Sequence, residues 1–268
     1  MNLSNLKLYI IFNVVSLLVA LSLNYLSISI PLNAKTIQEL SDLYPNYFVP
    51  AGFTFSIWGI IYLLMIAFIG YQLYQFHKKR KVTFEVIITI GPWFLVSGLA
   101  NATWILLWHY EWVFASVSVM LILLGALIKI YTSLKGLMPL PKNEIIFVQT
   151  YFSVYLGWIS VATIANVTTA FVSVGWQGGD IGQGNWTCIM IVVATLLGVL
   201  FIYKNKDIPF AAVIIWALYG MYNKQSPSSE DISQTVSIFA KYGGTLLFIY
   251  AVLSIIGKKT YYKSLQDG

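Results

Sequence analysis

The sequence predicts an all-α polytopic membrane protein. Of its 268 residues, 58% are hydrophobic and only 10% are charged, whereas a soluble domain carries about 25% charged residues. The apolar residues form long runs, and the run over residues 145–174 contains no charge. About 20 residues of α-helix cross the hydrocarbon core, and a helix satisfies its own backbone hydrogen bonds in lipid. We therefore expect a bundle of membrane-spanning helices.

Eight such helices are predicted. The first apolar run is too long for a cleavable signal peptide and lacks a small-residue cleavage site after it, so we expect a retained helix. The third is entered through Gly91-Pro92, and the seventh is the shortest. The spans are 8–30, 54–76, 86–108, 112–134, 145–174, 187–203, 208–222 and 234–257.

The basic residues support this count. With the N-terminus in the cytoplasm, all but three of the 16 Lys and Arg residues fall on the cytoplasmic side, and the exceptions are Lys35, Lys224 and Lys241. The positive-inside rule therefore predicts eight spans with both termini in the cytoplasm. We also expect residence in a plasma or inner membrane. Because the basic runs flank apolar segments, they indicate topology and not a nucleic-acid partner.

A Gly-rich loop bounded by Trp176 and Trp186 divides the chain. We expect a five-helix membrane unit over residues 1–175, a three-helix extension over 186–257, and a cytoplasmic tail over 258–268. The single cysteine, Cys188, excludes an intrachain disulfide and a cysteine-based metal cluster.

Several classes of chemistry are missing from the sequence. The predicted spans contain no Asp or Glu, which argues against proton pumps and ion-driven carriers. His77 and His109 lie at the ends of predicted helices. We therefore expect them to be interfacial residues and not axial haem ligands or general bases. Lys129 and Lys241 have no acidic partner within their spans, so we expect both to reach a membrane surface. We predict no enzyme, no catalytic residue and no metal site.

Aromatic and amide residues share one face of the fifth span. Tyr151, Tyr155, Trp158, Ala162, Asn166 and Thr169 recur at nearly helical spacing, and the rest of that helix looks suited to lipid. A buried carboxamide in an apolar helix needs partners, so this stripe should face protein.

The second and third spans repeat the pattern, with Phe55, Trp58 and Tyr62 on one and Trp93, Ser97, Asn101, Trp104 and Trp108 on the other. Two interpretations remain open. In the first, the amides only form hydrogen bonds between helices, and the tryptophans near the span ends form belts at the membrane interfaces. These tryptophans are Trp93, Trp108, Trp112, Trp176 and Trp186. Alternatively, the stripes line a pocket for a large planar apolar ligand, which needs flat faces and few polar contacts.

Three blocks on these spans read PAGFTFSIWGIIY from Pro50, NATW from Asn101 and YLGWISVATIAN from Tyr155. In this order, behind a Pro-containing first loop, they resemble the signature blocks of the tryptophan-rich sensory protein / translocator protein family (TspO/MBR). The resemblance covers about residues 8–175, so about three further helices form a C-terminal extension. The sequence departs from the family pattern at Val154, where the family has proline, and at Phe53, where it has tryptophan.

The resemblance implies a five-helix, often dimeric bundle that binds porphyrin or haem as a ligand, for sensing or transport. The expected partners are membrane lipid, a hydrophobic small molecule and a second copy of the chain. The lid would be the loop containing Pro45, Pro50 and Phe53. The ligand-binding residues implied by position are Trp58, Tyr62, Asn101, Trp104, Tyr155, Trp158, Ala162 and Asn166.

Two rivals belong to other functional classes. A small-molecule transporter would use the three extra helices to complete a path, with the loop at residues 175–184 as a hinge. A structural or assembly factor would use the aromatic stripes only for helix packing.

Overall fold

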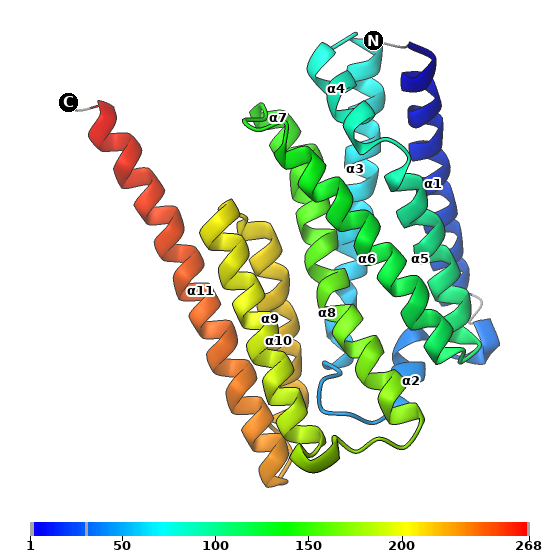
Figure 1. The fold of residues 1–268 in the computed structure, drawn as a ribbon, viewed down its shortest axis with the longest axis vertical. Coiled ribbons are helices and arrows are strands. Elements are labelled where there is room, and N and C mark those ends of the chain that lie inside the picture. The colour runs from blue at the N-terminus through cyan, green and yellow to red at the C-terminus, as the bar shows by residue number, and fades with distance from the viewer. Residues whose placement is uncertain (1–2, 30–31, 267–268) are drawn as a thin grey trace. The chain divides into compact units, whose positions relative to one another are not determined.

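The computed structural model describes residues 3–29 and 32–266, and its regular elements are all helices (Figure 1). The chain forms two compact units. Unit 1 comprises Met1–Pro45 and Phe55–Val174, and unit 2 comprises Asn46–Thr54 and Gly175–Gly268. Unit 2 thus contains the three C-terminal helices and also part of the first loop, which the sequence analysis places in the five-helix unit.

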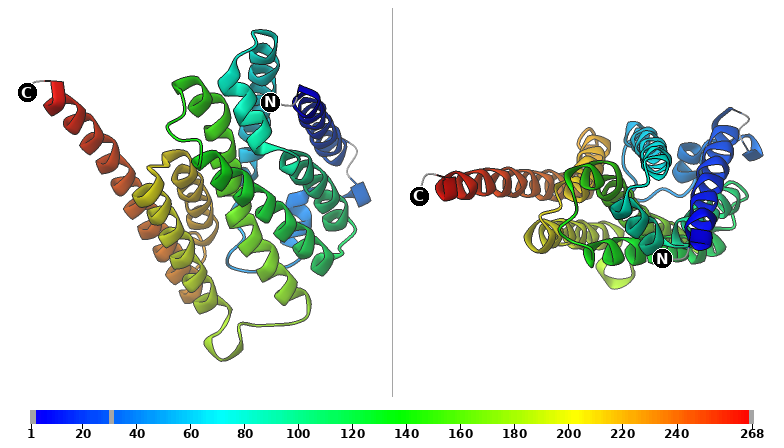
Figure 2. Two further views of the ribbon diagram at one scale, coloured as in Figure 1. Left: turned by 45° about the horizontal axis from the view of Figure 1, so that its top comes forward. Right: turned by 90° about the horizontal axis from the view of Figure 1, so that it is seen from above.

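Unit 1 is a bundle built around five long helices. Helix α5 packs on α1 and α6, and α8 packs on α6 and α3 (Figure 2). The short elements lie at the ends of the long ones. The helices are α1 (Leu3–Ser29), α2 (Ile37–Asp42), α3 (Ile57–His77), α4 (Lys81–Ile90), α5 (Trp93–His109), α6 (Val113–Lys135), α7 (Lys142–Glu144) and α8 (Thr150–Ser173), with the 3-10 turn η1 (Leu32–Ala34) and the π-helical turn η3 (Ile145–Gln149).

Unit 2 is a bundle of α9 (Gln183–Asn205), α10 (Ile208–Gln225) and α11 (Asp231–Gln266), in which each helix packs against the other two. The short turn η4 (Gly179–Ile181) precedes α9, and η2 (Gly52–Ser56) leads from the first loop into α3. Asp207 caps α10, because its carboxylate accepts a hydrogen bond from the Phe210 backbone N–H at 3.1 Å.

The third predicted span is two helices and not one. Helices α4 and α5 meet at an angle of 49°. Gly91 has φ +55°, a left-handed conformation open to glycine, and Pro92 follows it as the N-cap of α5. This pair therefore bends the chain inside the expected span.

The number of candidate spans also differs from eight. Among the described residues, six helices are long and apolar enough to cross a membrane, or seven if α4 and α5 form one span. Helix α10 forms as expected but is not one of them, because its last turn is polar. Helix α11 continues past Lys258 to Gln266, so the expected tail is helical at the backbone. Lysine ends an apolar segment but is a good helix former.

Helix α8 is the most buried of the candidate spans, with 61% of its most apolar stretch buried. The prediction that one side of α8 faces lipid is wrong for the first half of the helix. Phe152, Leu156 and Ile159, which lie off the aromatic stripe, are at most 2% exposed. Neighbouring helices α3 and α6 pack on α8, which makes it central to unit 1.

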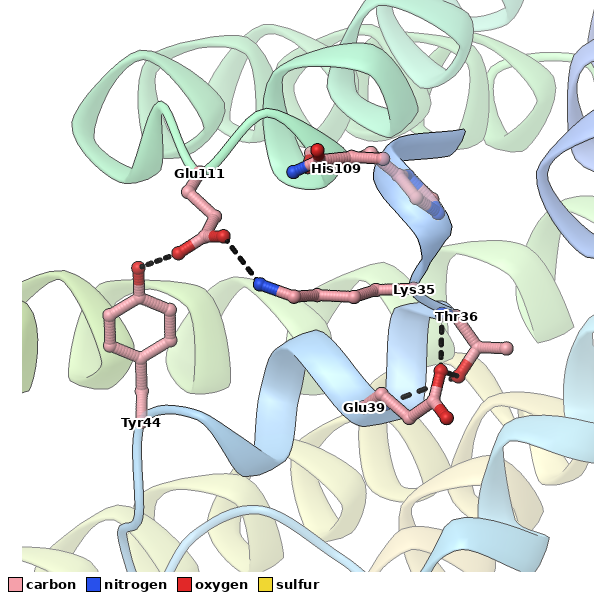
Figure 3. Close-up of polar contacts among 7 residues, drawn as sticks. Lys35, Thr36, Glu39, Tyr44, His109 and Glu111 are labelled. Carbon is pink, nitrogen blue, oxygen red and sulfur yellow. Dashed lines mark hydrogen bonds and ion pairs between the residues drawn. The ribbon is translucent and has the colours of Figure 1, made fainter. Parts of the chain in front are cut away.

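A polar cluster joins the first loop to the α5–α6 connection (Figure 3). Lys35 and Tyr44 both turn toward Glu111, with Lys35 Nζ 2.8 Å from Glu111 Oε1 and the Tyr44 hydroxyl 3.3 Å from Oε2. The hydrogen bond and charge of Lys35 lower the pKa of Glu111, against the opposing effect of burial. Thr36 and Glu39 form a capping box that starts α2.

Candidate aromatic binding site

Aromatic rings from α3, α5 and α8 gather around Trp58. Its ring centroid lies 5.7 Å from Tyr62, 6.5 Å from Trp104, 6.2 Å from Tyr155 and 6.3 Å from Trp158. These spacings and mutual angles are those of directly packed aromatic pairs. All five side chains belong to unit 1, and we call them the aromatic cluster.

Asn166 links three helices beside this cluster. Its Oδ1 accepts a hydrogen bond from the Trp104 indole N–H at 3.0 Å, and its Nδ2 donates to Ser116 Oγ at 3.0 Å. Asn166 is 3% exposed. The amide therefore connects α5, α8 and α6 in the way that buried polar groups connect membrane helices.

Asn101 makes a corresponding contact between α5 and α1. Its Oδ1 accepts a hydrogen bond from Asn24 Nδ2 at 3.1 Å, which ties α5 to α1. Asn24 also donates to the Ala20 carbonyl at 2.8 Å. The Nδ2 group of Asn101 is buried and has no hydrogen-bond partner among the described residues.

Further polar atoms near the rings are also unpaired. The hydroxyls of Tyr62 and Tyr151 and the indole N–H of Trp158 are buried without a hydrogen-bond partner in the described part of the chain. With Asn101 Nδ2, they make four groups able to donate, on α3, α5 and α8. A buried polar group left unpaired costs about 1–3 kcal/mol, so a ligand that supplies acceptors to these four groups would gain free energy.

Ala162 is half-buried on α8, one turn from both Trp158 and Asn166. Seven of the eight sequence-predicted ligand residues therefore carry the rings and amides described above, and Ala162 supplies a small surface between two of them. Most of the predicted lid loop, Asn46–Thr54, belongs to unit 2.

The loop Asn46–Thr54, which we call the anchored loop, is bound to α10 within unit 2. The Ala51 N–H donates to the Gly220 carbonyl at 3.1 Å, and the Trp216 indole N–H donates to the Thr54 carbonyl at 2.9 Å. A Cβ at Gly220 would clash with Thr54 Oγ1 and lie 3.0 Å from Pro50 Cβ. Only glycine permits this close approach.

Two further contacts extend the attachment. Phe53 packs edge-on against Trp216 and Tyr219, with ring centroids 5.5 and 5.8 Å apart. The Tyr47 hydroxyl donates to Glu230 Oε1 at 2.7 Å. Burial, and then this bond, raise the pKa of Tyr47 to about 12. Pro45 ends the preceding stretch of unit 1. The structure thus gives the lid segment a partner that the sequence analysis does not anticipate.

Helix α1 contributes polar groups that the sequence analysis misses. Asn13, Ser16, Asn24 and Ser27 are all buried, and they recur at i, i+3, i+11 and i+14. That spacing places them on one face of a helix, so the signal was present in the sequence. Trp108, which the sequence analysis assigns to an interfacial belt, is 6% exposed and stacks on Trp104.

A buried carboxylate is a second omission. Glu144 is 2% exposed and lies within the candidate span Lys142–Ser173. Its Oε1 accepts hydrogen bonds from Thr83 Oγ1 at 2.7 Å and the Tyr71 hydroxyl at 2.9 Å. Glu144 lies one residue before the predicted span 145–174, and the candidate span begins three residues earlier than predicted. Glu144 ties α7 to α3 and α4.

His109 lies outside the aromatic cluster, at the end of α5. Its ring is fully buried, and Nδ1 is 2.7 Å from the Ile105 carbonyl oxygen of the same helix. His109 thus lies at a helix end, as expected, with its ring packed against protein. Among the described residues, no group of three or more His, Cys, Asp or Glu side chains could hold a metal ion.

The family model described as "TSPO-like protein" matches residues 10–253. The matched stretch includes the helices of unit 1, and also α9, α10 and most of α11. No curated protein and no solved structure gives a significant match to the chain.

Proposed function

Because the chain belongs to the TSPO-like family and is an integral multi-pass membrane protein, we propose that its aromatic cluster binds a planar hydrophobic ligand. The ligand we favour is a tetrapyrrole such as protoporphyrin or haem. The protein would act in sensing or transport and not as an enzyme.

The observation that carries this proposal is the set of unpaired donors among flat rings. Tyr62, Asn101, Tyr151 and Trp158 each present a buried group that donates to nothing among the described residues. A flat macrocycle with carboxylates would supply acceptors for these groups and faces for the rings. A packing role alone would leave these four donors without acceptors.

The rings contact one another directly, so ligand entry requires them to part. Centroid distances of 5.7–6.5 Å around Trp58 leave no room for a further ring between them. We propose that the loop from Pro45 to Phe53 acts as the lid, because η2 connects it to the start of α3, where Trp58 lies. Binding should therefore be slower than diffusion.

Titration with protoporphyrin and with haem tests the proposal. The purified chain in detergent should shift the ligand's absorption band. Trp158→Ala and Asn101→Leu should each weaken binding about three- to tenfold, the effect of losing one aromatic or hydrogen-bond contact. Trp93→Ala, on α5 but 38% exposed, is the matched control and should leave the affinity unchanged. Equal affinity in all four proteins would remove the site assignment.

Two rival functions give different results in the same system. A transporter would show ligand flux into liposomes that depends on a gradient, with the Gly-rich loop before α9 as its hinge. A purely structural protein would bind neither porphyrin nor haem.

We also propose a plasma or inner membrane location with both termini in the cytoplasm, and a homodimer. Cysteines introduced at Lys35 and Lys263 test the orientation, because an impermeant thiol reagent added to intact cells should label only the first. Labelling of Lys263→Cys alone would reverse the topology. Crosslinking in the native membrane tests the dimer.

A further inference from the structure

Helices α10 and α11 enclose a groove of about 260 Å³ within unit 2. One wall carries Ile215, Tyr219 and Tyr222 of α10, at i, i+4 and i+7. The opposite wall carries Ala240, Lys241, Gly244, Thr245 and Phe248 of α11. Typical sites for drug-sized molecules occupy about 300–1,000 Å³, so this groove is small for a tetrapyrrole and suits a narrower, elongated molecule.

The groove has a charged end and an apolar end. The two helices are consecutive and joined by a short connection, so they run antiparallel, which sets Tyr222 opposite Lys241. The same pairing sets Ile215 opposite Phe248. Lys241 is the only charged residue that lines the groove. An amphiphile with one negative group would match this polarity along its length.

Lys241 lacks an acidic partner. Within the described part of the chain no carboxylate forms an ion pair with it. Its ammonium group lies over the Tyr222 ring, with Nζ 6.0 Å from the centroid. That distance is at the limit of a cation–π contact. A lysine within a candidate span, Asp231–Gly257, is costly unless it reaches water or a negative group.

The side chains around Lys241 favour a lipid headgroup as that negative group. Tyr219 is 51% exposed and Tyr222 is half-buried, and tyrosines at a membrane surface lie at the level of the headgroups. Their hydroxyls can donate hydrogen bonds to phosphate oxygens. Only 17% of the most apolar stretch of α11 is buried, so lipid has access to this helix.

We propose that this groove is a binding site for an anionic phospholipid, with the phosphate at Lys241 and one acyl chain along Gly244 toward Ile215 and Phe248. Gly244 keeps the groove open. A Cβ there would meet only Leu218 Cβ, at 3.7 Å, so a larger side chain fits the backbone and fills the space. The site lies in unit 2 and does not depend on ligand binding by the aromatic cluster.

Native mass spectrometry of the full chain tests the proposal with phosphatidylglycerol and phosphatidylcholine of identical acyl chains. The unaltered chain should retain phosphatidylglycerol about fivefold better, the preference that one lysine near an anionic surface contributes. Lys241→Gln should abolish the preference, and Lys241→Arg should keep it. Lys129→Gln, an exposed lysine in α6, is the matched control and should also keep it.

Gly244→Leu tests the space in the groove independently of the charge on Lys241. It leaves Lys241 in place and should reduce retention of both lipids while the protein stays helical and monodisperse. Equal loss in Lys241→Gln and Lys129→Gln would show only general attraction to anionic lipid and overturn the site. Unchanged retention of both lipids in Gly244→Leu would overturn it too. So would a change of oligomeric state in Lys241→Gln, because it would indicate a second copy as the occupant.

Discussion

The hydrogen bond between Trp104 and Asn166 gives the most direct test of how unit 1 is held together. Asn166→Leu keeps the side-chain volume close to that of the amide but removes the acceptor for Trp104 Nε1 at 3.0 Å and the donor to Ser116 at 3.0 Å. Interhelical hydrogen bonds in membranes average about 0.6 kcal/mol and reach about 1.7. Leaving a buried indole N–H unpaired adds about 1–3 kcal/mol. We therefore expect about 2–4 kcal/mol of destabilisation.

A double-mutant cycle isolates the contact itself. Trp104→Phe removes the N–H while keeping a ring in the cluster, and the cycle with Asn166→Leu should give a coupling energy of about 0.6–1.7 kcal/mol. Unfolding in bicelles, followed by loss of helical signal, measures each free energy. Trp93→Phe makes the same chemical change on the same helix at a 38% exposed position, and should show no coupling. Zero coupling for Trp104 would refute the role assigned to Asn166.

Three further predictions follow from single contacts. Gly220→Val should detach the anchored loop from α10 and speed hydrogen exchange of the loop amides, whereas Gly70→Val, with open space around it, should not; equal exchange in both would contradict the attachment. Glu144→Leu should destabilise unit 1 by about 2 kcal/mol because two hydroxyls lose their acceptor, while Glu144→Gln, which keeps one, should cost less than about 1; similar thermal shifts would argue against the bonds. The pKa of Glu111 is lowered in the folded protein, so the ion pair with Lys35 contributes about 0.2–1 kcal/mol to stability, the range for a partly exposed pair. This contribution is present above the unfolded pKa of about 4.3 and is lost as pH falls through the lowered folded pKa. In Lys35→Gln, the free energy of unfolding measured against pH should lose this decrease at acid pH.

Much of the fold follows from local pattern. The apolar runs place the long helices because a chain in lipid must bond its own backbone. Over the residues that the structure describes, all eight expected segments are helical, the third as a bent pair; residue 30, at the end of the first, lies outside them. The convergence of Trp58, Trp104 and Trp158 also agrees with the stripes, because rings repeated at helical spacing share a face. Whether that face binds a tetrapyrrole stays a prediction.

The errors arise where distant residues decide the outcome. The aromatic stripe of α8 suggests one protein face and one lipid face, yet Phe152 and Ile159 are fully buried, because an apolar side chain is equally suited to lipid and to a neighbouring helix. Hydropathy does not distinguish the two. In the sequence, Glu144 looks like a charge that ends an apolar segment. Only the structure shows that it is buried in unit 1, where Tyr71 and Thr83 donate hydrogen bonds to it.

The sequence by itself determined that this chain crosses a membrane as α-helices and that its rings and amides fall in stripes, because hydropathy and helical period are properties of consecutive residues. Tertiary structure alone decided which stripes meet, that Asn24 donates a hydrogen bond to Asn101, and that the anchored loop packs on α10. Those outcomes depend on contacts between residues far apart in the chain, as with Gly220, whose missing side chain admits a loop more than a hundred and sixty residues earlier.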